Sequence, residues 1–325
     1  MTKINRKIVL ESLFSSIGII LFIYLIWSVK LSSIVEAISH INLLYFSISL
    51  LLTPIIVMVD TCRWRSLAKD QDVDLDFSEM VKIYTAGLFL SSVTPGALGA
   101  YIRAKLLHDK GKNLSRSISN VVVDVSMRTL PLHLASIFIL ISLFPARSSL
   151  LSVILFLVAL SVLPLVVIYK GGKLSNRLVK SLFLPYISPN YADTVVKGVG
   201  KIFDKPPRFT SLLKSMLVTG VCLIPLMGLQ VYMVSLSMGI DVPLLDIAAI
   251  WVVSLSITCL PISISGLGVR EWSMAYMLNR YAIEKSTAIT LSLLGYTVLI
   301  FIPAIAGAFF FIHHSVSRFR SIKKG

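Results

Sequence analysis

The chain has 325 residues, of which 56% are hydrophobic and 14% are charged. Soluble domains carry about 25% charged residues, so this composition excludes a soluble globular enzyme. Lys and Arg number 31 against 16 Asp and Glu, a net charge of +15, and in a membrane protein such an excess indicates cytoplasmic loops rather than a nucleic-acid partner. We expect a single transmembrane domain over residues 1–325.

Six apolar stretches are long enough to cross a bilayer as helices, because about 20 residues span its hydrocarbon core. The first follows a basic N-terminus and lacks a small-residue cleavage site, so we expect an uncleaved anchor. The predicted spans are residues 8–28, 42–62, 117–143, 149–169, 211–238 and 287–312.

Two further apolar segments are interrupted by proline and glycine. Residues 79–107 contain TPGALG, and residues 243–278 contain PISISGLG. Proline removes a backbone donor and glycine weakens a helix, so neither segment is predicted to be one straight helix. Irregular backbone persists at membrane depth only inside protein or beside a wet cavity. We therefore predict two re-entrant helical hairpins.

The charges of the loops predict how these elements are oriented. Basic residues stand on both sides of the first broken segment, at positions 63–69 and 103–116, so both of its ends are predicted to face the cytoplasm. The basic loop of residues 170–210 then also faces inside, and the second broken segment enters from outside. Both chain termini are predicted to be cytoplasmic, in the cell membrane.

The resulting fold prediction is an all-α polytopic membrane protein with about six spans and two oppositely oriented hairpins. Opposed broken helices are typical of transporters that bind substrate near the midplane. Each broken segment contains a proline followed by Leu-Gly and then an arginine, Arg103 in the first and Arg270 in the second. This echo suggests an inverted repeat.

Three stretches carry a resemblance to a known family: GLFLSSVTPGALGAYIRAKLL, VVVDVSMRTL and CLPISISGLGVREWSM. They resemble signature segments of the flippase-like family related to the transmembrane domain of lysyl-phosphatidylglycerol synthase, over roughly residues 10 to 312. The resemblance implies a lipid-handling membrane protein without a soluble catalytic domain. Its relatives are linked to moving aminoacylated phospholipid or to steps with polyprenyl-phosphate-linked sugars.

The chain departs from the family pattern at three places. Ala97 and Ala100 stand where an arginine and a glutamate are frequent, and Gly295 and Tyr296 lie near the place of a late arginine that many members carry. A charge role at those positions is therefore lost, and the substrate is free to differ from the best-studied lipid of the family.

Arg103 and Arg270 follow the glycine turns, where broken helices begin or end. A helix N-terminus with an adjacent arginine can bind a phosphate, so we treat both as candidate lipid-phosphate ligands. The alternative is that each caps a helix or pairs with headgroups at the interface. The candidate site also includes the glycines of the two turns, Gly96, Gly99, Gly266 and Gly268.

Charged residues inside predicted spans complete the candidate site. Asp124 and Arg128 are four residues apart and share a helix face; they line a polar cavity or lock a hairpin in place. Glu271 is expected to pair with Arg270, with Arg128 or with a cationic headgroup. His133, which has no other histidine near it in the sequence, is expected to be a hydrogen-bonded core residue.

The charged cluster near residue 62 is predicted to have a structural role. Asp60 precedes Arg63, Trp64 and Arg65 at the end of the second predicted span, where Trp64 would anchor in the interface and the arginines would snorkel. Motifs of hydrolases, zinc proteases and nucleotide-binding loops are absent from the sequence, so no catalytic residue, cofactor or metal is predicted.

These observations predict a lipid translocase that moves a polar-headgroup lipid between leaflets. The expected partners are membrane lipids with phosphate-containing headgroups, with a lipid-modifying synthase or glycosyltransferase acting upstream, and no nucleic acid. Two alternatives remain: an intramembrane transferase that uses a lipid-linked donor, with Asp124 or Glu271 as base, and a proton-coupled carrier of small solutes.

Overall fold

The computed structural model describes residues 41–94, 98–143, 148–170, 205–259 and 265–324. The predicted first span, Gly96 and most of the basic loop lie outside these residues. Within them the chain is helical and contains no β-strand. Its helices are α3 Leu43–Asp70, α4 Phe77–Ser92, η1 Leu98–Tyr101, α5 Ile102–Asp109, α6 Leu114–Leu143, α7 Ser148–Lys170, α10 Phe209–Leu217, η3 Val218–Leu223, α11 Ile224–Ser237, α12 Leu244–Thr258, α13 Val269–Leu278, η4 Asn279–Tyr281, α14 Lys285–Tyr296, η5 Thr297–Phe301 and α15 Ile302–Lys324.

Helices long and apolar enough to cross a membrane occur where four of the spans were predicted. Their outer faces expose large apolar side chains, such as Leu51, Phe138 and Phe309, each about 70% accessible, which suits hydrocarbon better than water. Helix α7 matches the predicted span at 149–169, with a shorter apolar core at Leu151–Val166. The four long candidates are Leu43–Asp70, Leu114–Ser142, Phe209–Ser237 and Lys285–Val316.

Helix α3 runs further than the predicted span, which ended at residue 62. It continues to Asp70, and Asp72 just beyond its end has a left-handed backbone, with φ 57°. Trp64 is consequently fully buried, and its Nε1 donates to Asn120 Oδ1 at 2.7 Å. The predictions that Trp64 anchors in the interface and that Arg63 snorkels are therefore wrong.

Both broken segments form antiparallel helix pairs. In the first hairpin (residues 77–109), the end of α5 returns to the start of α4, where Lys110 Nζ lies 2.6 Å from Glu79 Oε2. In the second hairpin (residues 244–278), the helices α12 and α13 pack together, and Tyr281, just after α13, hydrogen-bonds to Asp246 in the first turn of α12. The interruptions expected at the Pro-Gly motifs are confirmed.

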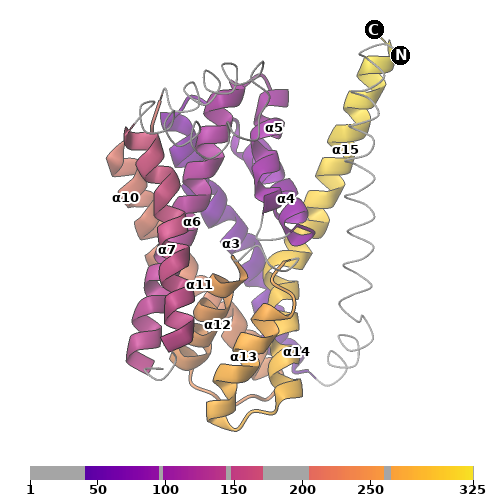
Figure 1. Ribbon diagram of the computed structural model, residues 1–325. Coiled ribbons are helices and arrows are strands. Elements are labelled where there is room, and N and C mark those ends of the chain that lie inside the picture. The colour runs from indigo at the N-terminus through magenta and orange to yellow at the C-terminus, as the bar shows by residue number, and fades with distance from the viewer. Residues whose placement is uncertain (1–40, 95–97, 144–147, 171–204, 260–264, 325) are drawn as a thin grey trace, which may run out of the picture.

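The two hairpins approach each other from opposite ends of the bundle (Figure 1). Their tips touch, because the Ser265 N–H donates to the Thr94 carbonyl at 3.4 Å. The order of long helix, hairpin and long helix occurs twice, first in α3 to α6 and then in α10 to α15, and the second set runs in the opposite direction (Figure 1). Two interrupted helices thus meet inside the bundle.

Glycines permit the tight geometry of the tips. At Gly99 a Cβ would lie 2.1 Å from the Leu90 carbonyl carbon, so only glycine lets η1 fold back against α4. In the second hairpin, Gly266 and Gly268 have φ of +74° and +85°, which side chains disfavour. The glycine patterns are therefore required by backbone geometry at both tips.

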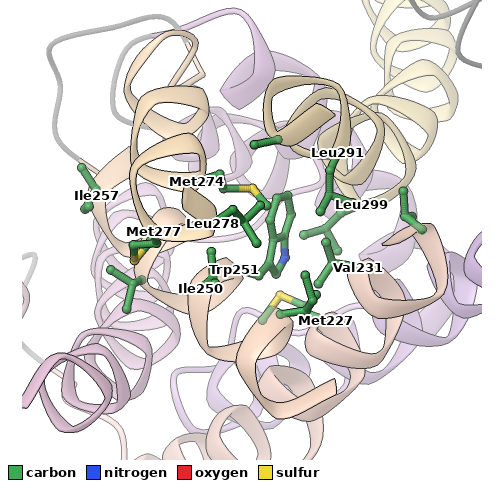
Figure 2. Packing of buried hydrophobic residues seen from close by; sticks show 14 of the residues in the cluster. Met227, Val231, Ile250, Trp251, Ile257, Met274, Met277, Leu278, Leu291 and Leu299 are labelled. Carbon is green, nitrogen blue, oxygen red and sulfur yellow. The ribbon is translucent and has the colours of Figure 1, made fainter. Parts of the chain in front are cut away.

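The second hairpin is held by a large apolar core. Trp251 of α12 lies at the centre of this core, between Met227 and Val231 of α11 and Met274 of α13 (Figure 2). All four side chains are buried. Apolar packing from α11, α12, α13 and α14 therefore fixes this hairpin in the bundle.

Candidate functional site

A buried network of charged side chains joins α3, α5 and α6. Arg63 donates from Nε to Asp60 Oδ1 at 2.8 Å and from a terminal nitrogen to Asp124 Oδ1 at 2.6 Å. Arg103 donates to the other oxygen of Asp124 at 2.7 Å. The side chains of these four residues are at most 4% exposed. Asp124 therefore bridges two arginines that come from different helices.

Arg128 joins the same network through Asp60. Its Nε lies 3.0 Å from Asp60 Oδ2, which also accepts a 2.5 Å hydrogen bond from the Tyr84 hydroxyl. Asp124 and Arg128 lie on one helix, as expected, and take part in one network. They do not pair with each other, because each finds a closer partner on another helix.

Arg103 is placed by the first hairpin. Its Nε donates to the Ala100 carbonyl at 3.1 Å, and its guanidinium lies over the rings of Trp64 and Tyr84, at 4.8 and 5.6 Å from their centroids. Room for it comes from Gly87, where a Cβ would lie 2.8 Å from Arg103 Cγ. The arginine therefore reaches inward to Asp124 instead of outward to an interface.

Arg270 is placed by the second hairpin and is fully buried. Its Nε donates to Ser292 Oγ at 3.0 Å, a terminal nitrogen pairs with Glu271, and its guanidinium stacks 4.2 Å from the centroid of Tyr296. Glu271 also accepts from the Gly268 N–H at 2.6 Å, which caps α13. Among the expected partners of Glu271, the structure selects Arg270.

A cavity of about 160 Å³ lies between the two hairpins. Three guanidinium groups line it, while the carboxylates of Asp60, Asp124 and Glu271 do not. The cavity thus brings together the arginines that sequence reasoning proposed from three separate segments. Its lining includes Arg103, Arg128, Arg270, Thr258, Ser265 and Tyr296.

A larger cavity of about 440 Å³ opens between α4, α5 and α15. Its wall is apolar, with Ile83, Leu106 and Phe310, and charges lie at its edge. Its two lysines, Lys82 and Lys110, both pair with Glu79 at 2.8 and 2.6 Å. The charge of its lysines is therefore partly compensated by one carboxylate, and its apolar wall suits a hydrocarbon chain.

Sequence reasoning missed Asp60, Arg63 and Tyr84 as members of the site. Their signal was present: Asp60 and Arg63 are three residues apart, which places them on one helix face, once α3 is known to continue past residue 62. His133 is buried as expected, yet its Nδ1 has no hydrogen-bond partner among the described residues. In the part of the chain that the structure describes, no group of His, Cys, Asp or Glu could hold a metal ion.

The long apolar helices and the buried charged centre between two opposed hairpins define a polytopic membrane protein. The chain belongs to the lysylphosphatidylglycerol synthase TM region family, whose profile matches residues 8–315. The resemblance noted in the sequence is thereby confirmed over nearly the whole chain.

Two curated relatives extend this comparison. The chain is 20% identical to a UPF0104 membrane protein of Pyrococcus horikoshii over 312 residues, which cover 90% of the chain and 93% of the relative. It is 22% identical to a UPF0104 membrane protein of Methanocaldococcus jannaschii over 318 residues, or 93% and 94%. These matches agree with a multi-pass membrane protein.

Proposed function

We propose that this protein is a lipid translocase that carries a phosphate-bearing headgroup between leaflets through the cavity between its hairpins. The observation that carries the proposal is the contact of the two tips beside a cavity lined by three arginines. A charged headgroup cannot cross hydrocarbon unaided at low cost. A buried cationic cavity supplies a polar binding site for the headgroup within the membrane, while the acyl or prenyl chains stay in lipid.

The proposed topology makes both hairpins re-entrant. The first enters from the cytoplasm and the second from outside, with both chain termini cytoplasmic, so the cavity lies near the midplane. Rocking of one half against the other would then open the cavity to each side in turn. The hydrogen bond between Ser265 and Thr94 is a contact that such a movement would break.

The state of Asp124 favours a translocase over a transferase. Both of its carboxylate oxygens accept hydrogen bonds from arginines of the protein itself, so the geometry uses Asp124 to hold two arginines in place. Glu271 is engaged in the same way, through Arg270, Ser292 and the cap of α13. These contacts give both carboxylates a structural role, which supports the proposed translocase.

A vesicle assay tests the function. Purified protein is reconstituted with acyl-labelled fluorescent lipids, and dithionite reports how fast label leaves the inner leaflet. We expect faster loss than in empty vesicles, slowed by Asp124→Asn but not by Arg116→Gln, which alters only an exposed ion pair with Asp72. Rates equal to those of empty vesicles for anionic, zwitterionic and lipid-linked-sugar probes would contradict the proposal.

Cysteine labelling tests the topology separately. In a chain whose three native cysteines are replaced, a cysteine at Lys112, just after the first hairpin, should react with an impermeant maleimide only from the cytoplasmic side. A cysteine at Arg280, just after the second hairpin, should react only from outside. Labelling of both from the same side would refute the re-entrant arrangement.

A further inference from the structure

We propose that the cavity between the hairpins selects a headgroup with net negative charge, a phosphate or phosphodiester, and that Arg128 is the cation that binds it. This inference rests on the proposed translocase and names its substrate class. It also separates this chain from a carrier of cationic, lysyl-bearing lipids.

The first argument is the charge of the buried network. Within the described residues, three arginines, Arg63, Arg103 and Arg128, share two carboxylates, Asp60 and Asp124. Among these five side chains one cation is therefore left without a counter-charge, while Arg270 and Glu271 balance each other. A desolvated charge is costly unless an opposite charge accompanies it. An anionic ligand would supply the missing charge.

The second argument identifies which arginine is available. Arg270 uses all three nitrogens, on Ser292, Ser265 and Glu271, and Arg103 is held by Asp124, Ala100 and two aromatic rings. Arg128 touches a carboxylate through Nε alone, and its terminal nitrogens form no hydrogen bond with the described residues. Its side chain is 32% exposed, against 4% or less for Arg103 and Arg270.

The third argument is the geometry of the cavity. Arg128 lines it, and the guanidinium fork matches two oxygens of a phosphate. A volume of about 160 Å³ exceeds by roughly tenfold the ~10–15 Å³ that one water requires, so a phosphate group fits. A lysyl amine would face three guanidiniums and no lining carboxylate, and like charges repel.

Binding is tested without transport. The full chain in nanodiscs of phosphatidylcholine is titrated with inorganic phosphate, and thermal unfolding is followed by intrinsic fluorescence. We expect phosphate to raise the unfolding temperature and Arg128→Gln to weaken the apparent affinity at least about tenfold. Arg116→Gln should bind as the unmodified chain does. Unchanged affinity in Arg128→Gln would overturn the inference.

Lipid-borne phosphate is tested in vesicles. Acyl-labelled phosphatidylglycerol, phosphatidylcholine and lysyl-phosphatidylglycerol are compared in the dithionite assay. We expect the phosphatidylglycerol rate to exceed the lysyl-lipid rate at least about tenfold. Ala100→Glu, which places a carboxylate in the cavity wall while keeping the arginines, should reduce or reverse this preference. Equal rates for all three lipids would overturn the inference.

These arms separate the two proposals. If no lipid moves but phosphate binds through Arg128, the anion site stands and the translocase fails. If lipids move without regard to headgroup charge, the translocase stands and the anion site fails. Should Arg128→Gln not fold, Arg128→Lys keeps the charge without the fork, and it is expected to weaken phosphate binding while eluting as a monodisperse protein.

Discussion

The two hairpins use the same residue type in different ways. Arg103 of the first hairpin finds its carboxylate on α6, at Asp124, which it shares with Arg63 of α3. Arg270 of the second hairpin finds its carboxylate at the next residue, Glu271, with support from Ser292 of α14. Arg103 is therefore neutralised by a network that spans three helices. Arg270 is neutralised by the adjacent residue of its own helix.

This difference assigns the hairpins different roles in the site. The second hairpin contributes a balanced ion pair, Arg270 with Glu271, and packs through the large apolar core around Trp251. The first hairpin depends on charges from α3 and α6 and belongs to a network with one cation in excess. The electrostatic character of the cavity is therefore set on the side of the first hairpin.

The difference between the two hairpins is tested most directly at the carboxylates that pair with their arginines, Asp124 and Glu271. Asp124→Asn leaves Arg63 with one carboxylate and Arg103 with none, so we expect a loss of about 3–5 kcal/mol in unfolding free energy. Glu271→Gln should cost less, because it removes the carboxylate partner of one arginine, whereas Asp124 pairs with two. Reversible unfolding in mixed micelles measures both.

A double-mutant cycle is the control for this prediction. Combining Asp124→Asn with Arg103→Gln restores the original charge balance, so the double variant should be more stable than the sum of the two losses predicts, by about 0.5–3 kcal/mol. Equal losses for Asp124→Asn and Glu271→Gln, with no coupling in the cycle, would show that the arginines of the two hairpins are neutralised in the same way.

The glycine of the first tip should give the next largest effect. In Gly99→Ala the new Cβ would lie 2.1 Å from the backbone of Leu90, so η1 must move away from α4, at a cost of about 1–3 kcal/mol or more. The control is Gly220→Ala in η3, where no positive φ strains a side chain and nothing beyond the local backbone lies within 4 Å of the added Cβ. A Gly99→Ala variant as stable as the control would refute the close approach.

Much of the fold was predictable because it depends on local signals. Apolar runs located α3, α6, α7, α10–α11 and α14–α15, and proline with glycine located both interruptions. The end of α3 was misplaced because hydropathy falls at Arg63 while helix propensity continues. Loss of apolar character predicted the end of the span, although the helix ends only at Asp70.

Some residues of the buried network were predictable from the sequence, but their partners were not. Asp124 and Arg128 were singled out as charges in an apolar span, and Arg103 because it follows a glycine turn, which are both local signals. Their partners were not, because Asp60 and Arg63 lie 64 and 61 residues before Asp124 and meet it only when α3 packs on α6. The Glu271 pair was foreseen, because its partner is the adjacent residue.

The glycine at the cap of α13 offers a milder test of the second tip. Gly268 has φ +85°, and a Cβ added there would have no other atom within 4 Å, so Gly268→Ala adds backbone strain without a clash. We expect a loss of about 1–3 kcal/mol, the cost of a sparsely populated backbone region, below that of Gly99→Ala, by the same unfolding measurement. A larger loss than at Gly99 would reverse the order of the two tips.

An exposed ion pair at the entrance of the first hairpin should give the smallest effect. Asp72, between α3 and α4, accepts a hydrogen bond from Lys205 and lies near Arg116, and these contacts hold the pKa of its carboxyl below the ordinary value. A depressed pKa contributes stability above the unfolded value of about 3.9 and loses it as pH falls through the folded value. Asp72→Asn should therefore remove a small part of the stability at neutral pH and none at low pH.

Salt distinguishes this pair from the buried network. The Asp72 contribution should vanish in about 1 M salt, where the Debye length is ~3 Å, whereas the cost of Asp124→Asn should persist because its partners are shielded from solvent. Comparing unfolding of both variants at low and high salt measures the difference. If both losses vanished with salt, the network around Asp124 would be open to solvent ions. The contrast between that network and the local pair of Arg270 and Glu271 would then be wrong.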